Sequence, residues 1–351
     1  MFYVKKKTID LIFCKFVKKI DVMKKLHYLF IFPILLIIFS CNNPSYKNTP
    51  TAHGKSGEIV VVMSNESWNS EPGDTLRAIF HEYCPANPLE EHLFDLHQIS
   101  KDKFIDQNLY HRNVIFQEID ANIKDSKLSI VLDKYAQNQV FVNVAAPNQA
   151  ALVNELSKYR NNFIKLFLEA DRDRWISMFS KNYNKTISDK ILKKYNLSIK
   201  LPINYYLDVY DENFAWISHE SRQYSMAFLI YTYPLTDSSE FTSKYLIQER
   251  NKILKENVPG SRPDSYMTTE VKYDYPSLEK ITHNGLETAV MRGLWKVKGD
   301  FMGGPFVSYT KMDKPRNRMV CIEAYVYYPN EETRDKMRQL EGVIYTYDIV
   351  K

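Results

Sequence analysis

Apolar residues along the chain follow two periods, one typical of strands and one typical of helices. In the first half of the chain, short runs rich in β-branched residues predict four strands: Glu58–Met63, Val114–Ile119, Leu128–Leu132 and Val140–Val144. The first run is apolar at every position from Ile59 to Met63, which is typical of a strand covered on both faces.

Helices are predicted between and after these strands. Asp74 is a candidate N-cap for a short helix, and another short helix is expected at Lys185–Tyr195. A long helix is predicted after Pro147, because apolar residues recur there every three or four positions. This stripe consists of Leu152, Leu156, Tyr159, Phe163, Leu166 and Ala170. The charged segment Asp171–Arg174 near its end is expected to be solvated.

The second half is rich in tyrosine and in strand-like alternation. Seven strands are predicted: Ile203–Tyr210, Phe214–His219, Tyr224–Tyr233, Met267–Tyr273, Glu287–Val297, Phe306–Lys311 and Met319–Tyr328. Helices are expected at Thr242–Asn257 and after Asn330. The hairpin-like spacing of the strands predicts an α+β protein made of two consecutive blocks, 58–196 and 197–351. Each block is expected to be a mostly antiparallel sheet with helices packed on one face.

A different apolar pattern occupies the start of the chain. Lys24 and Lys25 precede an apolar run at Tyr28–Phe39, and small Ser40 follows it. A run of about twelve residues is too short to cross a bilayer core of about 30 Å as a helix. The order of basic, apolar and small residues is typical of a signal peptide at 1–40. Met23 begins this pattern and is an alternative start of the chain.

The end of the predicted leader indicates lipidation. Ile38-Phe39-Ser40-Cys41 resembles a bacterial lipobox, in which the cysteine is acylated and becomes the mature N-terminus. An ordinary secretory signal and an uncleaved anchor are the alternatives. Residues 41–57 are polar and rich in Pro, Ser, Thr and Asn, so they are expected to form a flexible tether between the membrane and the folded part.

The net charge of the chain bears on whether a nucleic acid is a possible partner. The chain has 47 Lys and Arg and 42 Asp and Glu, but eight of the basic and two of the acidic residues precede Cys41. The mature chain therefore has a net charge of about −1, which argues against a nucleic-acid partner. Cys84 and Cys321 are the cysteines after Cys41. An exported compartment permits a disulfide between them, although two free thiols remain the other possibility.

Several short motifs together indicate a family. They are Gly57–Met63 with Trp68, Gly73–Arg77, His111–Val114, Phe214–Ile217, Gly303–Tyr309, Glu323–Tyr327 and Arg338–Glu341. In combination they resemble an uncharacterised lipoprotein family of Bacteroidetes-type bacteria, a domain of unknown function. The resemblance implies export and lipidation. It implies no activity, so no catalytic residue follows from it.

The residues themselves predict no catalytic, metal or cofactor site. His92 and His97 are five positions apart, whereas a helical zinc pair needs a spacing of four and a third ligand. The strongest candidate site is a loop between two predicted strands, because five of the ten glycines lie between Gly285 and Gly304. The candidate contact residues are Gly299, Asp300, Phe301, Met302, Gly303 and Gly304. The alternative is a structural hairpin whose aromatic side chain folds back onto the core.

These patterns favour a binding or envelope-assembly protein over an enzyme. The expected location is the outer membrane, with the lipid as anchor and the folded part in the periplasm rather than at the cell surface. The expected partner is an envelope protein or a glycan. The alternative function is an envelope hydrolase that acts on glycan or peptide through carboxylates brought together by folding.

Overall fold

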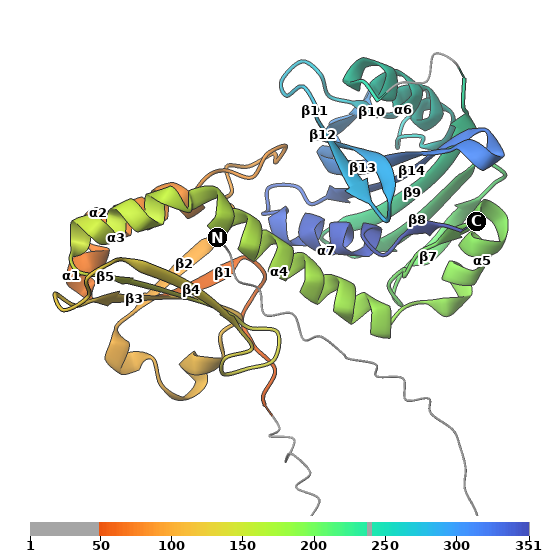
Figure 1. Cartoon of the computed structure of the whole chain (residues 1–351). Coiled ribbons are helices and arrows are strands. Elements are labelled where there is room, and N and C mark those ends of the chain that lie inside the picture. The colour runs from red at the N-terminus through yellow and green to blue at the C-terminus, as the bar shows by residue number, and fades with distance from the viewer. Residues whose placement is uncertain (1–48, 237–240, 351) are drawn as a thin grey trace, which may run out of the picture. The chain divides into compact units, whose positions relative to one another are not determined.

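The computed structural model of the protein describes residues 49–236 and 241–350 (Figure 1). The predicted leader and the predicted lipidation site, Cys41, lie outside these residues. We refer to residues 49–181 as the first lobe and to residues 182–350 as the second lobe. The protein is an α+β protein, as predicted. No helix in the described ranges is long and apolar enough to cross a membrane.

The first lobe is built on a five-stranded sheet in the order β2-β1-β3-β5-β4. Its strands are β1 (Glu58–Val62), β2 (Asp95–Ile99), β3 (Asn113–Ile119), β4 (Lys127–Leu132) and β5 (Val140–Ala146). All neighbouring strands pair in parallel except β4 and β5. The prediction of a mostly antiparallel sheet is therefore wrong for this lobe.

The buried central strands explain this parallel pairing. Ile59 and Val61 of β1 pack into the core on one face of the sheet, and Val60 and Val62 pack into the core on the other. A strand covered on both faces is typical of parallel sheets. The apolar run of β1 thus correctly predicted a strand buried on both faces. The hairpin-like spacing of the strands wrongly predicted that neighbouring strands run antiparallel.

Helices cover one face of this sheet, as predicted. They are α1 (Asn65–Trp68), α2 (Glu71–Phe80), α3 (Gln149–Lys158) and α4 (Arg160–Lys181). Asp74 lies inside α2 rather than at its start, where Ser70 is the N-cap. The predicted long helix is interrupted at Tyr159, which separates α3 from α4. Short 3-10 turns at Lys101–Lys103 and Asp106–Tyr110 lie between β2 and β3.

The second lobe is built on an antiparallel eight-stranded sheet, as predicted. The order is β10-β12-β13-β14-β9-β8-β7, and β11 also pairs with β12. Its strands are β7 (Tyr206–Tyr210), β8 (Phe214–Glu220), β9 (Ser225–Pro234), β10 (Tyr266–Thr269), β11 (Ser277–His283), β12 (Leu286–Lys298), β13 (Gly303–Asp313) and β14 (Arg318–Tyr327). A separate short pair joins β6 (Leu197–Ser198) to β15 (Asp348–Ile349).

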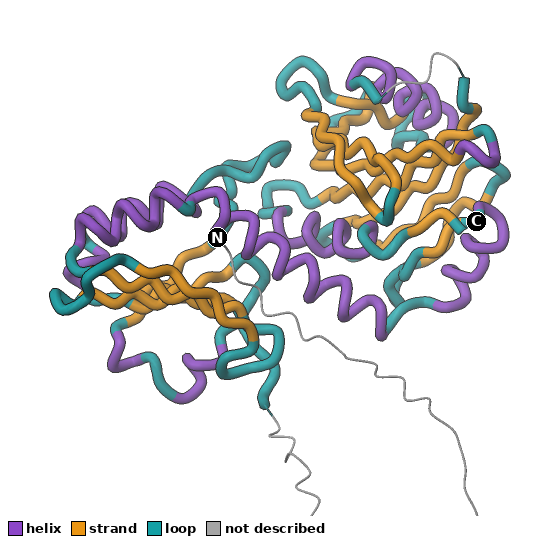
Figure 2. The backbone as a smooth tube through the Cα atoms, viewed as in Figure 1, coloured by secondary structure: helices purple, strands orange, loops and turns teal. Residues whose placement is uncertain are grey.

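Helices lie on both faces of the second sheet, not on one (Figure 2). Buried side chains of α5 (Lys185–Tyr195) and α7 (Arg334–Ile344) belong to one core, and those of α6 (Ser243–Asn257) belong to the other. The predicted alternation of β14 accounts for this arrangement. Ile322 and Ala324 lie in the first of these cores, whereas Cys321 and Tyr325 lie in the second.

Two segments near the lobe boundaries differ from the expected limits. The block boundary was expected at residue 196, yet Ile187, Ile191 and Tyr195 of α5 pack in the core of the second lobe. Residues 49–57 were expected to belong to a flexible tether. Instead the backbone N–H of Ala52 donates to Gln137 and that of His53 donates to Tyr110, so this segment is fixed along the first lobe.

Candidate functional site

The predicted contact loop is a tight turn with one exposed apolar tip. It connects β12, which ends at Lys298, to β13, which begins at Gly303. Phe301 is 96% exposed, whereas Met302 is partly buried against the core. Asp300 accepts a hydrogen bond from the Ser261 hydroxyl, which lowers the pKa of its carboxyl group.

The glycines of this loop have a structural explanation. Gly299 has a φ of +90°, a conformation that other residues rarely adopt. A Cβ atom at Gly304 would lie 2.1 Å from the carbonyl oxygen of Val326, so only glycine lets the backbones approach this closely. The loop therefore retains Phe301 as its one fully exposed apolar side chain.

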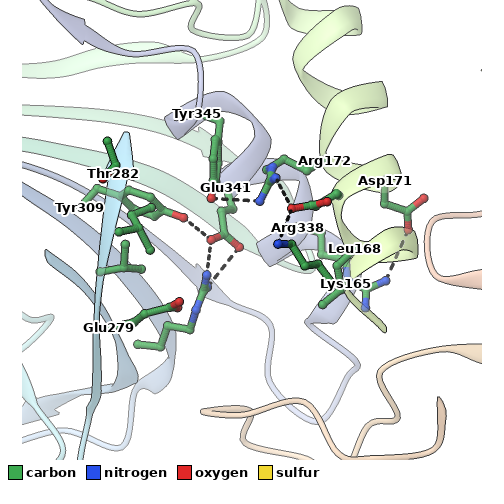
Figure 3. A pocket seen from close by; sticks show the side chains of 14 residues that line it. Lys165, Leu168, Asp171, Arg172, Glu279, Thr282, Tyr309, Arg338, Glu341 and Tyr345 are labelled. Atoms are coloured by element: carbon green, nitrogen blue, oxygen red, sulfur yellow. Dashed lines mark hydrogen bonds and ion pairs between the residues drawn. The ribbon is translucent and has the colours of Figure 1, made fainter. Parts of the chain in front are cut away.

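A cavity that the sequence did not predict lies between α4, α7 and strands β11 to β13. It has a volume of about 510 Å3 and continues into a second cavity of about 310 Å3. Both cavities are lined by Leu168, Glu279, Arg292, Arg338 and Glu341. We refer to the two together as the cleft; the larger cavity is drawn in Figure 3.

One wall of the cleft carries a fixed ion pair. Two nitrogens of Arg292 on β12 bind the two oxygens of Glu341 on α7, and the hydroxyl of Tyr309 on β13 donates to the same carboxylate (Figure 3). Burial raises the pKa of Glu341, but Arg292 and Tyr309 outweigh this effect and lower it below its usual value. Glu341 is therefore a charged acceptor whose oxygens are already bound.

A second carboxylate, that of Asp171 on α4, is bound even more completely. Its side chain is 1% exposed and accepts hydrogen bonds from the backbone N–H of Gly57 at 2.7 Å and the hydroxyl of Ser56 at 3.2 Å. Arg174 of the same helix lies at 2.7 Å and Arg338 of α7 at 3.5 Å. Asp171 thus joins three segments that are far apart in the sequence.

The burial of Asp171 corrects the expectation that Asp171–Arg174 is solvated. Asp171 lies four positions after Phe167 and eight after Phe163, and both phenylalanines are buried in the core of the first lobe. Residues at this spacing share one face of a helix. The spacing was visible in the sequence, so it was a signal that could have identified Asp171 as buried.

Four charged side chains lining the cleft are held less firmly. Lys165, Glu169 and Arg172 lie on α4, where Glu169 is 3.9 Å from Lys165 and 3.8 Å from Arg172. Arg172 also donates to the hydroxyl of Tyr345 at 2.9 Å. Opposite them lies Glu279 of β11, whose carboxylate has no side-chain hydrogen bond or ion pair within the described part of the chain (Figure 3).

By their pKa values and spacing, the cysteines and histidines that the structure describes show neither an activated thiol nor a metal-binding group. Cys84 and Cys321 are both free thiols, and burial raises the pKa of Cys84 to about 11 and that of Cys321 to about 12. Thiols with such pKa values are poor nucleophiles at neutral pH. The described residues contain no group of three or more His, Cys, Asp or Glu side chains arranged to hold a metal ion.

Two domains of unknown function are present. Residues 52–180 match the family described as "Domain of unknown function (DUF8532)". Residues 183–346 match the family described as "Domain of unknown function (DUF4837)". The boundary between the two matches falls at the end of α4. A comparison with curated proteins finds no match.

Distant similarity to solved structures covers 44% of the chain. One structure is a mutant of the protein Mog1, with 10% identity, a TM-score of 0.30 and 91% of that chain covered. Another is the Ran-binding protein Mog1p of Saccharomyces cerevisiae, with 9% identity, a TM-score of 0.31 and 90% covered. TM-scores this low carry no argument about function.

Proposed function

We propose that this protein is a lipid-anchored envelope protein that binds a ligand in the cleft and performs no chemistry on it. The observation that carries the proposal is that two carboxylates, those of Glu341 and Asp171, are already bound by other groups of the protein. Glu341 is bound by Arg292 and Tyr309, and Asp171 is bound by arginines and by the backbone. Carboxylates held in this way shape and rigidify a site, but they are poor proton donors or acceptors for a substrate.

The charges that remain available define the ligand. Lys165 and Arg172 share a single carboxylate, Glu169, which leaves an excess positive charge on the α4 wall. Glu279 supplies a negative charge on the β11 wall. A short zwitterionic peptide, free or linked to a glycan, has an ammonium group for one wall and a carboxylate for the other. This chemistry agrees with an envelope partner.

Titration calorimetry with short peptides and with peptide-bearing glycan fragments tests the binding. We expect binding by the unmodified protein and at least a tenfold weaker affinity for Glu279→Gln and for Arg172→Gln, because each removes a charge-assisted contact of about 1.5 kcal/mol or more. Glu287→Gln is the matched control, since Glu287 is exposed on β12 and does not line the cleft. Equal affinity of all variants would contradict the proposal.

The second candidate function is hydrolysis of a glycan or peptide, and one observation favours it. Glu279 lines the cleft, and its carboxylate has no ion pair and no side-chain hydrogen bond among the described residues. If it acts as a general base, the unmodified protein cleaves the fragments and Glu279→Gln does not, while binding persists. Mass spectrometry of the fragments after incubation distinguishes the two functions.

The proposed anchor is acylated Cys41 at the outer membrane, with the folded part in the periplasm. The support is the lipobox-like order of residues before Cys41. Acyl chains contribute about 0.8 kcal/mol per buried methylene, so more than one chain anchors a protein stably. Cys41→Ala is expected to leave the membrane fraction and to lose the acyl mass. Rapid protease digestion of the folded part in intact cells would contradict the periplasmic orientation.

A further inference from the structure

A pocket beside the second half of α4 is lined by cationic side chains. It has a volume of about 320 Å3, and Arg112, Arg174 and Lys181 are the charged residues in its wall. Arg174 and Lys181 are seven positions apart on α4 and so lie on one face of the helix. Arg112 directly precedes β3. We refer to this cavity as the basic pocket.

Other cavities of the protein have acidic residues in their walls. Glu279 and Glu341 line the cleft, and Glu220 lines a cavity of about 460 Å3 beside the turn between β8 and β9. In contrast, no Asp or Glu side chain from the described ranges lines the basic pocket. Of these cavities it is therefore the one whose charge favours an anion.

The positive charge of the basic pocket is only partly neutralised by the protein. Asp171 is a single carboxylate shared by three arginines, which are Arg112 at 3.8 Å, Arg174 at 2.7 Å and Arg338 at 3.5 Å. Burial lowers the pKa of Arg174, and the nearby charge of Arg112 adds to this effect although Asp171 opposes it. An anion in the pocket would relieve this repulsion.

Arg112 and Lys181 are left without acceptors for their donor groups. The distance from Arg112 to Asp171 is too long for a hydrogen bond, and the Nε of Arg112 has no partner within the part of the chain that the structure describes. Lys181 is exposed and has neither an ion pair nor a side-chain hydrogen bond there. The indole N–H of Trp175, in the same wall, also lacks a partner. The basic pocket therefore lacks acceptors rather than donors.

The basic pocket also has an apolar side. Trp175 and Met178 belong to its wall, and Met178 is 44% exposed. Met178 lies four positions after Arg174 and three before Lys181, so it shares their face of the helix. An exposed apolar side chain between cations suits an anion that carries apolar groups, as a lipid headgroup does.

We propose that the basic pocket binds the phosphate group of a phosphomonoester, with Arg112 and Lys181 as its charged donors. At pH 7 such a group carries about two negative charges and three acceptor oxygens, whereas a carboxylate carries one charge. A guanidinium group can also bind two phosphate oxygens at once. Two sources share this chemistry, which are the headgroup of a membrane lipid and free phosphate.

The place of the pocket in the chain favours the lipid, and this part of the inference rests on the proposed anchor at Cys41. Thr51 and Ala52 line the pocket, and Thr51 follows Cys41 by ten residues. A chain of ten residues spans at most about 36 Å. Acylation of Cys41 would therefore keep the basic pocket within this distance of the bilayer surface.

Titration calorimetry of the protein in mild detergent tests the site. The probes are inorganic phosphate and dihexanoyl phosphatidic acid, a short-chain lipid with a phosphomonoester headgroup. We expect both to bind, with about tenfold weaker affinity for Arg112→Gln and for Lys181→Gln, because each change removes a charge-assisted hydrogen bond. Lys193→Gln is the matched control, since Lys193 is an exposed lysine on α5 and does not line the pocket.

The outcomes separate the two sources and the alternatives. An affinity at least tenfold higher for the lipid than for inorganic phosphate assigns the pocket to a headgroup, and equal affinities assign it to free phosphate. Acetate that binds as tightly as phosphate overturns the proposal, as does the absence of saturable binding at millimolar concentration. Binding that Lys181→Gln leaves unchanged also overturns it, and this exposed position keeps the test independent of folding. Neither probe requires the anchor or the cleft, so a failure here is distinct from a failure of peptide binding or of acylation.

Discussion

Glu323 and Asp171 are both buried carboxylates bound by arginine, but their donors come from different parts of the fold. Glu323 on β14 is 0% exposed and binds Arg250 of α6 at 2.7 and 2.8 Å. The remaining Arg250 nitrogen donates to Thr269 at 2.7 Å. Asp171 instead binds the segment at Ser56 and Gly57, its own helix and α7.

The two carboxylates therefore have different structural roles: Glu323 belongs to the core of one lobe, whereas Asp171 connects segments that are far apart in the sequence. The Arg250–Glu323 pair lies wholly within the second lobe, where both charges have lost their water, so the attraction between them is largely offset by desolvation. The arginines around Asp171 keep some contact with solvent: the side chain of Arg338, which lines the cleft, is 12% exposed, and that of Arg174 is 13% exposed. We therefore expect the same chemical change to have a larger effect at Glu323.

The largest effect is expected when Arg250 alone is replaced in the Arg250–Glu323 pair. Arg250→Met leaves the Glu323 carboxylate buried without its main donor, and we expect a loss of about 3–5 kcal/mol in the free energy of unfolding. The double change Arg250→Met with Glu323→Leu should recover most of this loss, because it removes both charges. Chemical denaturation measures both. If the double variant is as unstable as the single one, packing rather than charge explains the pair.

A buried charge without a hydrogen bond is expected to respond in the opposite way: its removal should stabilise the protein, although the Nζ of Lys311 lies 4.2 Å from the ring centroid of Tyr347. Lys311 on β13 is 0% exposed, its Nζ has no hydrogen-bond partner among the described residues, and burial lowers its pKa from 10.5 to about 8. Below pH 8 the folded protein bears the whole cost of this buried ammonium group. We expect Lys311→Met to raise the free energy of unfolding by about 2–3 kcal/mol at pH 7.

The pH dependence of Lys311 makes this prediction specific. Between about pH 8 and 10.5 the unfolded chain binds more protons at Lys311 than the folded protein does, so the stability of the unmodified protein rises with pH. The advantage of Lys311→Met should therefore shrink across this range. Denaturation curves at pH 7 and pH 10 test it, and a constant advantage would assign the gain to packing.

Asp171 is expected to contribute less to the free energy of unfolding than the Arg250–Glu323 pair. Asp171→Asn removes one charge from among Arg174, Arg338 and their neighbours, and we expect a loss of about 1–3 kcal/mol. Glu323→Gln is the matched change in the Arg250–Glu323 pair and should lower the free energy of unfolding more than Asp171→Asn does. Measured in the same buffer, the reverse order would contradict the distinction between the two carboxylates.

The smallest effect on stability is expected at the exposed tip of the β12–β13 loop. Phe301→Ser should change the free energy of unfolding by less than about 0.5 kcal/mol, since Phe301 is 96% exposed. Gly304→Ala in the same loop should cost about 1–3 kcal/mol, because its Cβ meets the backbone of Val326. An envelope phenotype of Phe301→Ser with normal stability would identify the tip as a contact site.

Local features of this fold could be predicted from the sequence, whereas long-range ones could not. The alternation of β14 and the apolar run of β1 gave the right elements because each depends on its own residues. Strand β11 escaped prediction because exposed residues dominate it, as at Glu279 and Lys280. Parallel pairing in the first sheet depends on how the connections between strands cross the sheet, and the apolar pattern within each strand does not determine this.

The candidate site shows the same limit. Clustered glycines drew attention to the loop at Gly299–Gly304, where they have a structural explanation at Gly299 and Gly304. The cleft was missed because its residues come from α4, β11 to β13 and α7, and no short motif joins them. Charged residues such as Arg292 and Glu341 read as ordinary surface positions until the fold pairs them.

The strand order of the second sheet has a consequence for the synthesis of the chain. Strand β14 lies between β9 and β13, and β15 at the end of the chain pairs with β6. When β9 leaves the ribosome, its neighbour on that side does not yet exist, and everything from α6 to β13 must be made first. The first sheet, in contrast, is complete once β5 has emerged. During translation β7, β8 and β9 therefore emerge before β14, the strand that pairs with β9. Their apolar side chains are exposed during this interval, which is when binding by a chaperone would protect the chain most from aggregation.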